Sequence, residues 1–343
     1  MTTPTDDRGG NYLWDRSDPV DPIVADLERR LAPLAFDPAA RRLVTARPRR
    51  RLRVIALAGA IAASIVVAAG FWYYHWRLTW PANHAWTMVV TEASPSSPAQ
   101  SGQLGVGEPL ALPAPASAHI DVARLGTIDA TPGTELTVSA TESQHHRVQM
   151  TKGSVDVRLW APPFTVAFRT PAGDVVDLGC RFTLTVDPQG IAFLTVRTGW
   201  VQLTNAFGES LVPAGASSLM QADRRPFVPV YDDAAPEFLD AVRAFERAAG
   251  DPAQPLLQGV ALGKFVRPRD VLTLLMLATR QDGSARADLV AAAASLVPPP
   301  AGVTVAAASR SDNDALWKWV NSLALPPVKD WWRNWRDALP RRP

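Results

Sequence analysis

The sequence predicts a membrane-anchored protein in which a single transmembrane helix is followed by an all-β domain of short strands and then by a helical C-terminal region. Residues 54–76 carry no Asp, Glu, Lys or Arg. Between residues 106 and 222, short runs of alternating apolar and polar residues recur between turns that contain Gly or Pro, as is typical of strands. From residue 236 onward, apolar residues recur at the spacing of amphipathic helices.

Composition and charge restrict the possible function classes before any motif is considered. With 343 residues, the chain is long enough for one large or two modest domains. Its formal net charge of +2 gives no general attraction to nucleic acid, so we expect no nucleic-acid partner. The single cysteine, Cys180, excludes an internal disulfide framework.

Residues 1–53, the predicted cytoplasmic segment, contain one helix. Asp21 is placed to cap it, and Pro22 occupies the first helical position, where a missing N–H is tolerated. Apolar side chains then recur at spacings of four and three along one stripe: Ile23, Leu27, Leu31 and Leu34. A second apolar cluster, which includes Trp14, precedes the helix.

The apolar stripe of this helix has no evident cover, because residues 1–53 contain no second element. A helix of about a dozen residues is only marginally stable alone in water. Three interpretations remain open: the helix docks into a partner's groove, it lies on the membrane surface, or it has little structure. Its polar faces mix both signs of charge, whereas an interfacial helix is usually rich in Lys and Arg. The mixed charge favours a partner protein.

Residues 54–76 form the predicted transmembrane helix. At about 1.5 Å per residue the run extends over roughly 34 Å, enough for a hydrocarbon layer of about 30 Å. Arginines crowd residues 41–53, and Trp and Tyr residues follow between 72 and 80. The positive-inside rule places the N-terminus in the cytoplasm and the chain after about residue 80 outside. A signal peptide would have an unusually long charged region, and a core helix would leave the arginines unexplained.

The outer part divides into three by composition. Residues 77–105 are rich in Ser, Pro, Ala and Gly, which predicts a juxtamembrane linker. Residues 106–222 form the predicted β domain, with alternation plainest at 164–168 and 182–186. Residues 236–343 are expected to be helical, with helices beginning near Pro236, at 268–270, at 285 and at 311–312, and with a Trp-rich tail at 328–339.

A series of short motifs in the β domain resembles the FecR domain. In order, the motifs are KGSV at 152–155, FTV at 164–166, TPAG at 170–173, LGCRF at 178–182, VRTGWV at 196–201 and VPAG at 212–215. The resemblance covers roughly residues 100–222. Cys180 replaces the usual Thr of the family, and we expect a buried small residue at this position.

The resemblance to the FecR family implies a single-pass protein of the bacterial inner membrane, with a cytoplasmic N-terminus and a periplasmic C-terminus. Such proteins are signal transducers that regulate an extracytoplasmic-function sigma factor through the cytoplasmic segment. The candidate sigma-binding residues are therefore Trp14, Ile23, Leu27, Leu31 and Leu34. The family also implies a solenoid-like β domain and an unknown periplasmic or outer-membrane partner. No clear second receptor-docking domain follows residue 222, so iron-siderophore sensing is not supported.

The sequence carries no recognisable catalytic or metal-binding motif. It contains no phosphate-binding Gly loop, no G-x-S-x-G and no HExxH. His145 and His146 are adjacent, and adjacent side chains on a strand point to opposite faces, so they do not form a metal site together. We therefore expect no enzyme, no cofactor and no metal. The alternative to a regulator is a non-enzymatic envelope scaffold or adhesion protein that binds other surface components.

Overall fold

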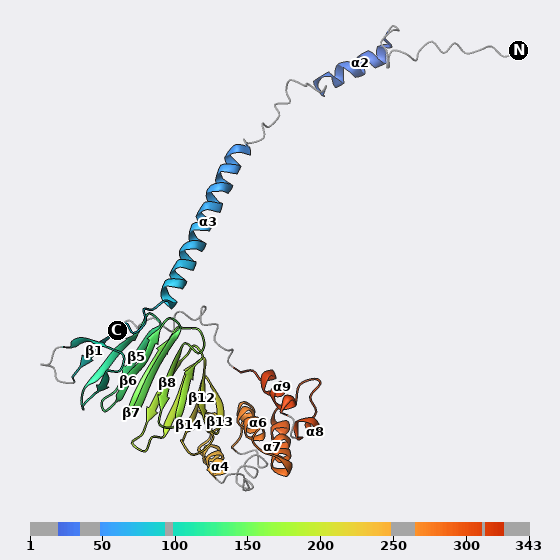
Figure 1. The fold of residues 1–343 in the computed structure, drawn as a ribbon. Coiled ribbons are helices and arrows are strands. Elements are labelled where there is room, and N and C mark those ends of the chain that lie inside the picture. The colour runs from blue at the N-terminus through green and yellow to red at the C-terminus, as the bar shows by residue number, and fades with distance from the viewer. Residues whose placement is uncertain (1–19, 35–48, 93–98, 248–264, 311–312, 326–343) are drawn as a thin grey trace. The chain divides into compact units, whose positions relative to one another are not determined.

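The structure is a computed structural model that describes residues 20–34, 49–92, 99–247, 265–310 and 313–325 (Figure 1). By its internal contacts the chain divides into two compact units, residues 1–70 and 71–343. The predictions made for Trp14 and for the Trp-rich tail at 328–339 lie outside the described residues.

The first unit contains the predicted N-terminal helix. Helix α2 (Pro22–Leu31) begins where expected, because Asp21 accepts a hydrogen bond from the Ile23 N–H at 2.8 Å. A short 3-10 turn, η1 (Ala32–Leu34), follows it. Both the N-cap and the position of Pro22 therefore follow from local sequence alone.

Helix α3 (Arg49–Leu78) contains the predicted membrane span. The section Ile55–Leu78 is long and apolar enough to cross a membrane, judged by length and composition. The side chains of residues 55–76 are exposed all around the helix within the described part of the chain. An apolar surface on every side is typical of a helix surrounded by lipid rather than of one packed on a soluble core by a single face.

The described strands join into one 15-stranded sheet that is bent into two halves. One half contains β1 (Trp86–Thr91), β2 (Gln100–Leu104), β4 (Ser117–Val122), β5 (Gly126–Ala130), β10 (Arg181–Val186), β11 (Ala192–Thr198), β14 (Ala216–Met220) and β15 (Val230–Tyr231). The other contains β3 (Pro109–Ala111), β6 (Glu135–Glu142), β8 (Val166–Thr170), β9 (Gly173–Asp177), β12 (Trp200–Asn205) and β13 (Gly208–Pro213).

The long strand β7 (His145–Leu159) belongs to both halves and connects them. Its first part pairs with β6 and β8, and its second part pairs with β5 and β10. Gly153 lies at the transition, with φ +102°, and a Cβ there would lie 2.3 Å from Thr134 Cα. Glycine is therefore required at this point for both conformation and space.

The pairing of the strands differs from the solenoid-like domain that the family resemblance implies. A solenoid stacks repeated units that contact only their neighbours. Here the described strands pair antiparallel, with β7 and β8 as the one parallel pair. Short turns join most sequential strands, and such turns connect antiparallel rather than parallel neighbours.

The core lies between the inward faces of the two halves. The alternation predicted at 182–186 is confirmed, because Phe182, Leu184 and Val186 are buried. The alternation predicted at 164–168 is wrong, because Phe164 is exposed and the next four residues are all buried. Phe182 packs edge-on against Phe168 of β8, with ring centroids 5.8 Å apart and an interplanar angle of 88°. Cys180 is fully buried, as expected for a small core residue.

The residues at 77–105 differ from the linker that their composition predicts. They contain β1 and β2, which pair antiparallel, and β1 also pairs with β4. Trp86 is fully buried, and its indole N–H donates to Thr141 Oγ1 at 2.9 Å. The apolar run at 86–90 is short and lies next to the Ser- and Pro-rich stretch, so composition averaged over the whole segment hides it.

The C-terminal region of the described chain is helical. It contains α4 (Pro236–Arg247), the 3-10 turn η2 (Pro268–Asp270), α6 (Val271–Ala278), α7 (Gly283–Leu296), α8 (Val305–Ala308) and α9 (Asp314–Ser322). Every residue of α6 is buried, and this helix contacts η2, α7 and α9. The helix α8 was not predicted, because four residues are too few to show a period.

Candidate partner-binding helix and polar network of the β domain

Helix α2 presents the predicted partner-binding stripe at its surface. Ile23, Leu27 and Leu31 recur every four residues and share one face, and their exposed fractions are 79%, 56% and 50%. Leu34 in η1 is 79% exposed. None of the residues of α2 is buried. The helix thus brings three of the five predicted residues onto one face, and their role in binding stays a prediction.

The polar side of α2 carries both signs of charge. Asp26 lies 3.2 Å from Arg29 Nη1 and 2.9 Å from Arg30 Nε. These spacings of three and four residues place the partners side by side on a helix. The arginines are therefore partly neutralised, which fits an interfacial helix on anionic lipid less well than a face turned to a protein.

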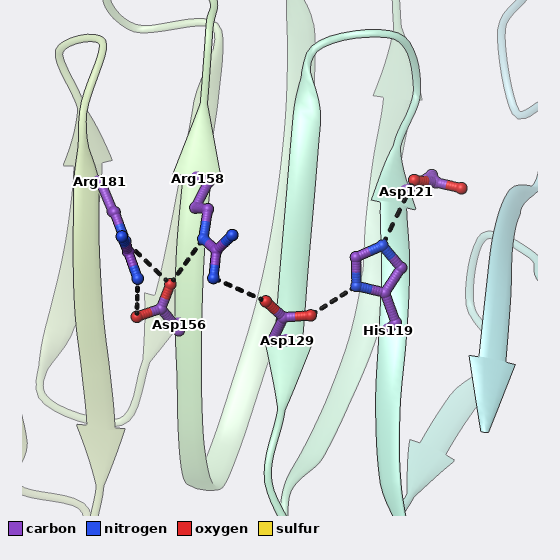
Figure 2. A network of polar contacts seen from close by, with 6 residues as sticks. All are labelled: His119, Asp121, Asp129, Asp156, Arg158 and Arg181. Atoms are coloured by element: carbon purple, nitrogen blue, oxygen red, sulfur yellow. Dashed lines mark hydrogen bonds and ion pairs between the residues drawn. The ribbon is translucent and has the colours of Figure 1, made fainter. Parts of the chain in front are cut away.

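Six ionisable side chains form a network across the outward face of one half of the sheet (Figure 2). They are His119 and Asp121 of β4, Asp129 of β5, Asp156 and Arg158 of β7, and Arg181 of β10. Asp156 Oδ1 lies 3.3 Å from Arg158 Nε and 3.4 Å from Arg181 Nε. The carboxylate thus bridges two guanidinium groups on adjacent strands.

The network continues from Arg158 towards β4. Arg158 Nη2 lies 3.6 Å from Asp129 Oδ2, and the other oxygen of Asp129 lies 2.5 Å from His119 Nδ1. His119 Nε2 is 3.8 Å from Asp121, which also accepts a hydrogen bond from Thr87 Oγ1 at 2.8 Å. The register places Asp129 opposite Asp156 and Arg158 opposite Arg181. The ion pairs therefore run diagonally between rows, and they offset the repulsion of these directly opposed like charges.

A second polar chain is buried where β1 meets the hairpin of β6 and β7. Trp86 donates to Thr141 Oγ1, and this hydroxyl lies 2.8 Å from His146 Nδ1. Since the single hydroxyl proton of Thr141 is free to donate to Nδ1, the neutral imidazole with its proton on Nε2 fits the site. Burial, together with the nearby His145 and Arg147, lowers the pKa of His146 to about 4.

The neighbouring His145 side chain is exposed, while His146 is buried. The two side chains therefore lie on opposite faces of β7, as the alternation of a strand predicts. This geometry keeps the two imidazoles from acting as ligands of one ion.

Cys180 makes a local contact with Asp177. The Cys180 N–H donates to Asp177 Oδ1 at 2.9 Å, and the thiol donates to the same oxygen. Both residues are fully buried. The thiol is thus a packed core group that a dissolved substrate does not reach.

The end of α3 is fixed to the β domain by aromatic and arginine side chains. Arg124 Nη1 donates to the carbonyl oxygens of Trp76 and Thr79 at 2.9 and 2.8 Å. The guanidinium also lies 4.2 Å from the ring centroid of Trp76 and 5.3 Å from that of Trp80. Trp80 exchanges two hydrogen bonds with Ser143, at 3.0 and 3.1 Å. Sequence reasoning missed this junction because Arg124 and Ser143 are far away in sequence.

Comparison with known proteins gives little beyond this geometry. No protein-family model matches the chain, and no curated protein matches it. Two crystal structures of a "putative anti-sigma factor" from Parabacteroides distasonis ATCC 8503 are similar, each at 15% sequence identity and a TM-score of 0.31. The match covers 39% of this chain and 63% of those chains. A likeness of this extent does not define a shared fold, and it carries no argument about function.

Proposed function

We propose that the chain is a membrane-anchored regulator that binds an extracytoplasmic-function sigma factor through α2 in the cytoplasm. In this proposal the β domain lies outside the membrane and modulates that binding. Its own partner there is an unknown periplasmic or outer-membrane protein. The order of the FecR-like motifs supports a regulator over an envelope scaffold or adhesion protein.

The observation that carries the proposal is the exposed stripe of α2. Ile23, Leu27 and Leu31 are half or more exposed on one face, and no described residue of the chain covers them. Burial of apolar surface is favourable by about 25 cal/mol per Å². Anchors at every fourth residue are typical of an amphipathic helix that docks into a hydrophobic groove.

The composition around α3 supports the proposed topology. Ile55–Leu78 has the length and hydropathy of a membrane span. Arginines precede it and aromatic residues lie at its end. The positive-inside rule then assigns α2 to the cytoplasm, the compartment in which a sigma factor is found.

The proposal is tested by affinity capture of the full-length chain from host membranes in mild detergent. We expect the wild type to retain a sigma factor, identified by mass spectrometry, and L27D/L31D to lose it. A buried aspartate without a partner would cost several kcal/mol in a groove. The matched control is R29Q, which changes charge on the opposite side of α2.

The same preparations distinguish the proposed regulator from the alternative of an envelope scaffold. A regulator changes transcription directed by the recovered sigma factor in vitro, and L27D/L31D removes this effect. Retention of surface proteins alone, with no difference between wild type and L27D/L31D, would refute the proposal and favour the scaffold.

A further inference from the structure

A hollow on the outward face of β6, β7, β8 and β9 is lined by two arginine side chains, Arg147 and Arg169. Its volume is about 410 Å³. In the strand register, Arg147 lies beside Ala167, and Ala167 lies beside Val176. In the next row, Gln149 lies beside Arg169, and Arg169 beside Asp174. Ala167 is short and buried, so it forms a floor between longer side chains.

The hydrogen-bonding groups of this hollow are unbalanced in favour of donors. Asp174 accepts from Arg169 through both of its oxygens, at 3.0 and 3.4 Å. Arg147 uses only Nη1, which donates to the carbonyl oxygens of His146 and Thr165 at 2.9 and 3.3 Å. Among the described residues, Arg147 Nε and Nη2 and Arg169 Nη1 donate to no protein acceptor. These N–H donors line a hollow in which the carboxylate of Asp174 is already paired with Arg169.

The charge of the hollow is also unbalanced. Two guanidinium groups share a single carboxylate, Asp174, and His145 lies at the rim. One further carboxylate, Glu142, lies opposite His145 in the register of β6 and β7. Partial burial lowers the pKa of Arg147, and Arg169 lowers it further, while Asp174 raises it. The site therefore holds a partly desolvated positive charge that an anion would stabilise.

We propose that this hollow binds the oxyanion group, carboxylate or phosphate, of a small ligand through Arg147 and Arg169. Guanidinium groups bind both kinds of oxyanion through paired N–H donors. Gln149 lies in the same row as Arg169 and supplies an amide that can contact a neutral part of the ligand. The inference concerns binding alone and does not depend on the proposed function.

The test uses the full-length chain in a neutral detergent at low salt. Titration calorimetry is carried out with inorganic phosphate and with glucuronate, and glucose is the uncharged match of glucuronate. We expect saturable binding of at least one of the two anions and none of glucose. Phosphate alone would identify a phosphate ligand, glucuronate alone would identify a carboxylated sugar, and both would identify the shared chemistry.

Variants locate the binding. R147Q is expected to weaken anion binding by about tenfold or more, which corresponds to about 1.4 kcal/mol. Arg169 is exposed, so R169Q serves as the second variant if R147Q does not fold. The control, R197Q, removes the same charge from an exposed position of β11. The absence of saturable binding by either anion, or equal weakening in R197Q, would overturn the proposal.

Discussion

At the scale of single residues, two buried ionisable groups should make opposite contributions to the pH dependence of stability. His146 is buried and neutral beside Thr141, with a pKa near 4. Glu246 of α4 accepts from the Val228 N–H at 3.0 Å and lies 2.6 Å from Arg280. Burial nevertheless raises the pKa of Glu246 to about 7, because desolvation outweighs the attraction of Arg280.

The His146 site is predicted to make the protein less stable in acid. The unfolded chain takes up a proton at a pKa of about 6.5, whereas folded His146 does so only near pH 4. The unfolded state binds more protons between these values, so stability is lost as pH falls from 6.5 to 4. The loss is up to about 3 kcal/mol. Thermal unfolding of wild type and H146Q across this range measures it, and identical pH profiles would contradict the prediction.

Glu246 is predicted to act with the opposite sign in nearly the same range. Its pKa is higher in the folded state, so its contribution falls as pH rises from about 4.5 to 7. The wild-type profile is thus the sum of two opposing slopes. E246Q should make the acid-side loss of stability steeper than in wild type, and a shallower profile would show that the sign is wrong.

Asp156 is the residue on which the network of Figure 2 depends. Its side chain is 26% exposed, and it bridges Arg158 and Arg181. D156A leaves both guanidinium groups half-buried without their shared carboxylate, so we expect a loss of about 1–2 kcal/mol in unfolding free energy. The control is E135A, which removes an exposed pair with Lys152 and should have a much smaller effect. Equal effects of the two changes in chemical denaturation would be the contrary result.

At the scale of elements, the C-terminal helices are connected by one buried arginine. Arg286 of α7 is 1% exposed. It donates to the carbonyl oxygens of Ala308 and Ala278 at 2.8 and 3.5 Å and to Asn313 Oδ1 at 2.7 Å. It therefore satisfies backbone acceptors near the ends of α6 and α8 and contacts the start of α9.

Removing this arginine should loosen the helical region before the sheet. R286M leaves two buried carbonyl acceptors and the half-buried Asn313 amide oxygen without their donor, and we expect a loss of about 2–4 kcal/mol. Limited proteolysis should cut first between residues 278 and 313. R310M, which changes an exposed arginine nearby, is the control. Cleavage that begins in the β domain instead would count against the prediction.

The elements also differ in how well sequence anticipates them. Helix α2, with its Asp21 cap and stripe, and the strand at 182–186 were predictable because each depends on neighbours a few residues away. Strands β1 and β2 were not, because their stability comes from pairing with β4 and from the burial of Trp86. Such tertiary contacts commonly override a weak local signal.

At the scale of the whole molecule, the contacts of Arg124 connect the end of α3 to the β domain. Arg124 Nη1 donates to the carbonyl oxygens of both Trp76 and Thr79. The Asn83 N–H also donates to the Thr141 carbonyl at 2.8 Å. The last turn of α3 is therefore held to the β domain by direct hydrogen bonds and packing.

Weakening this junction should be visible without any partner protein. R124A removes two hydrogen bonds and two cation–π contacts, so amide exchange at residues 79–84 should become about tenfold faster. The control is R197A on β11, which is exposed. Hydrogen-exchange mass spectrometry of the full-length chain measures both, and unchanged exchange in R124A would show that the junction is held by its aromatic residues alone.

The sequence by itself determined the apolar span in α3, the stripe of α2, the alternation at 182–186 and the change to helices after residue 236. These are periodic or compositional properties of adjacent residues, which local geometry converts directly into elements. The tertiary structure alone decided that β7 serves both halves of the sheet, that Asp156 bridges two arginines, and that Arg124 holds the end of α3. The reason is physical: these contacts join strands far apart in sequence, and their register depends on the packing of the whole core.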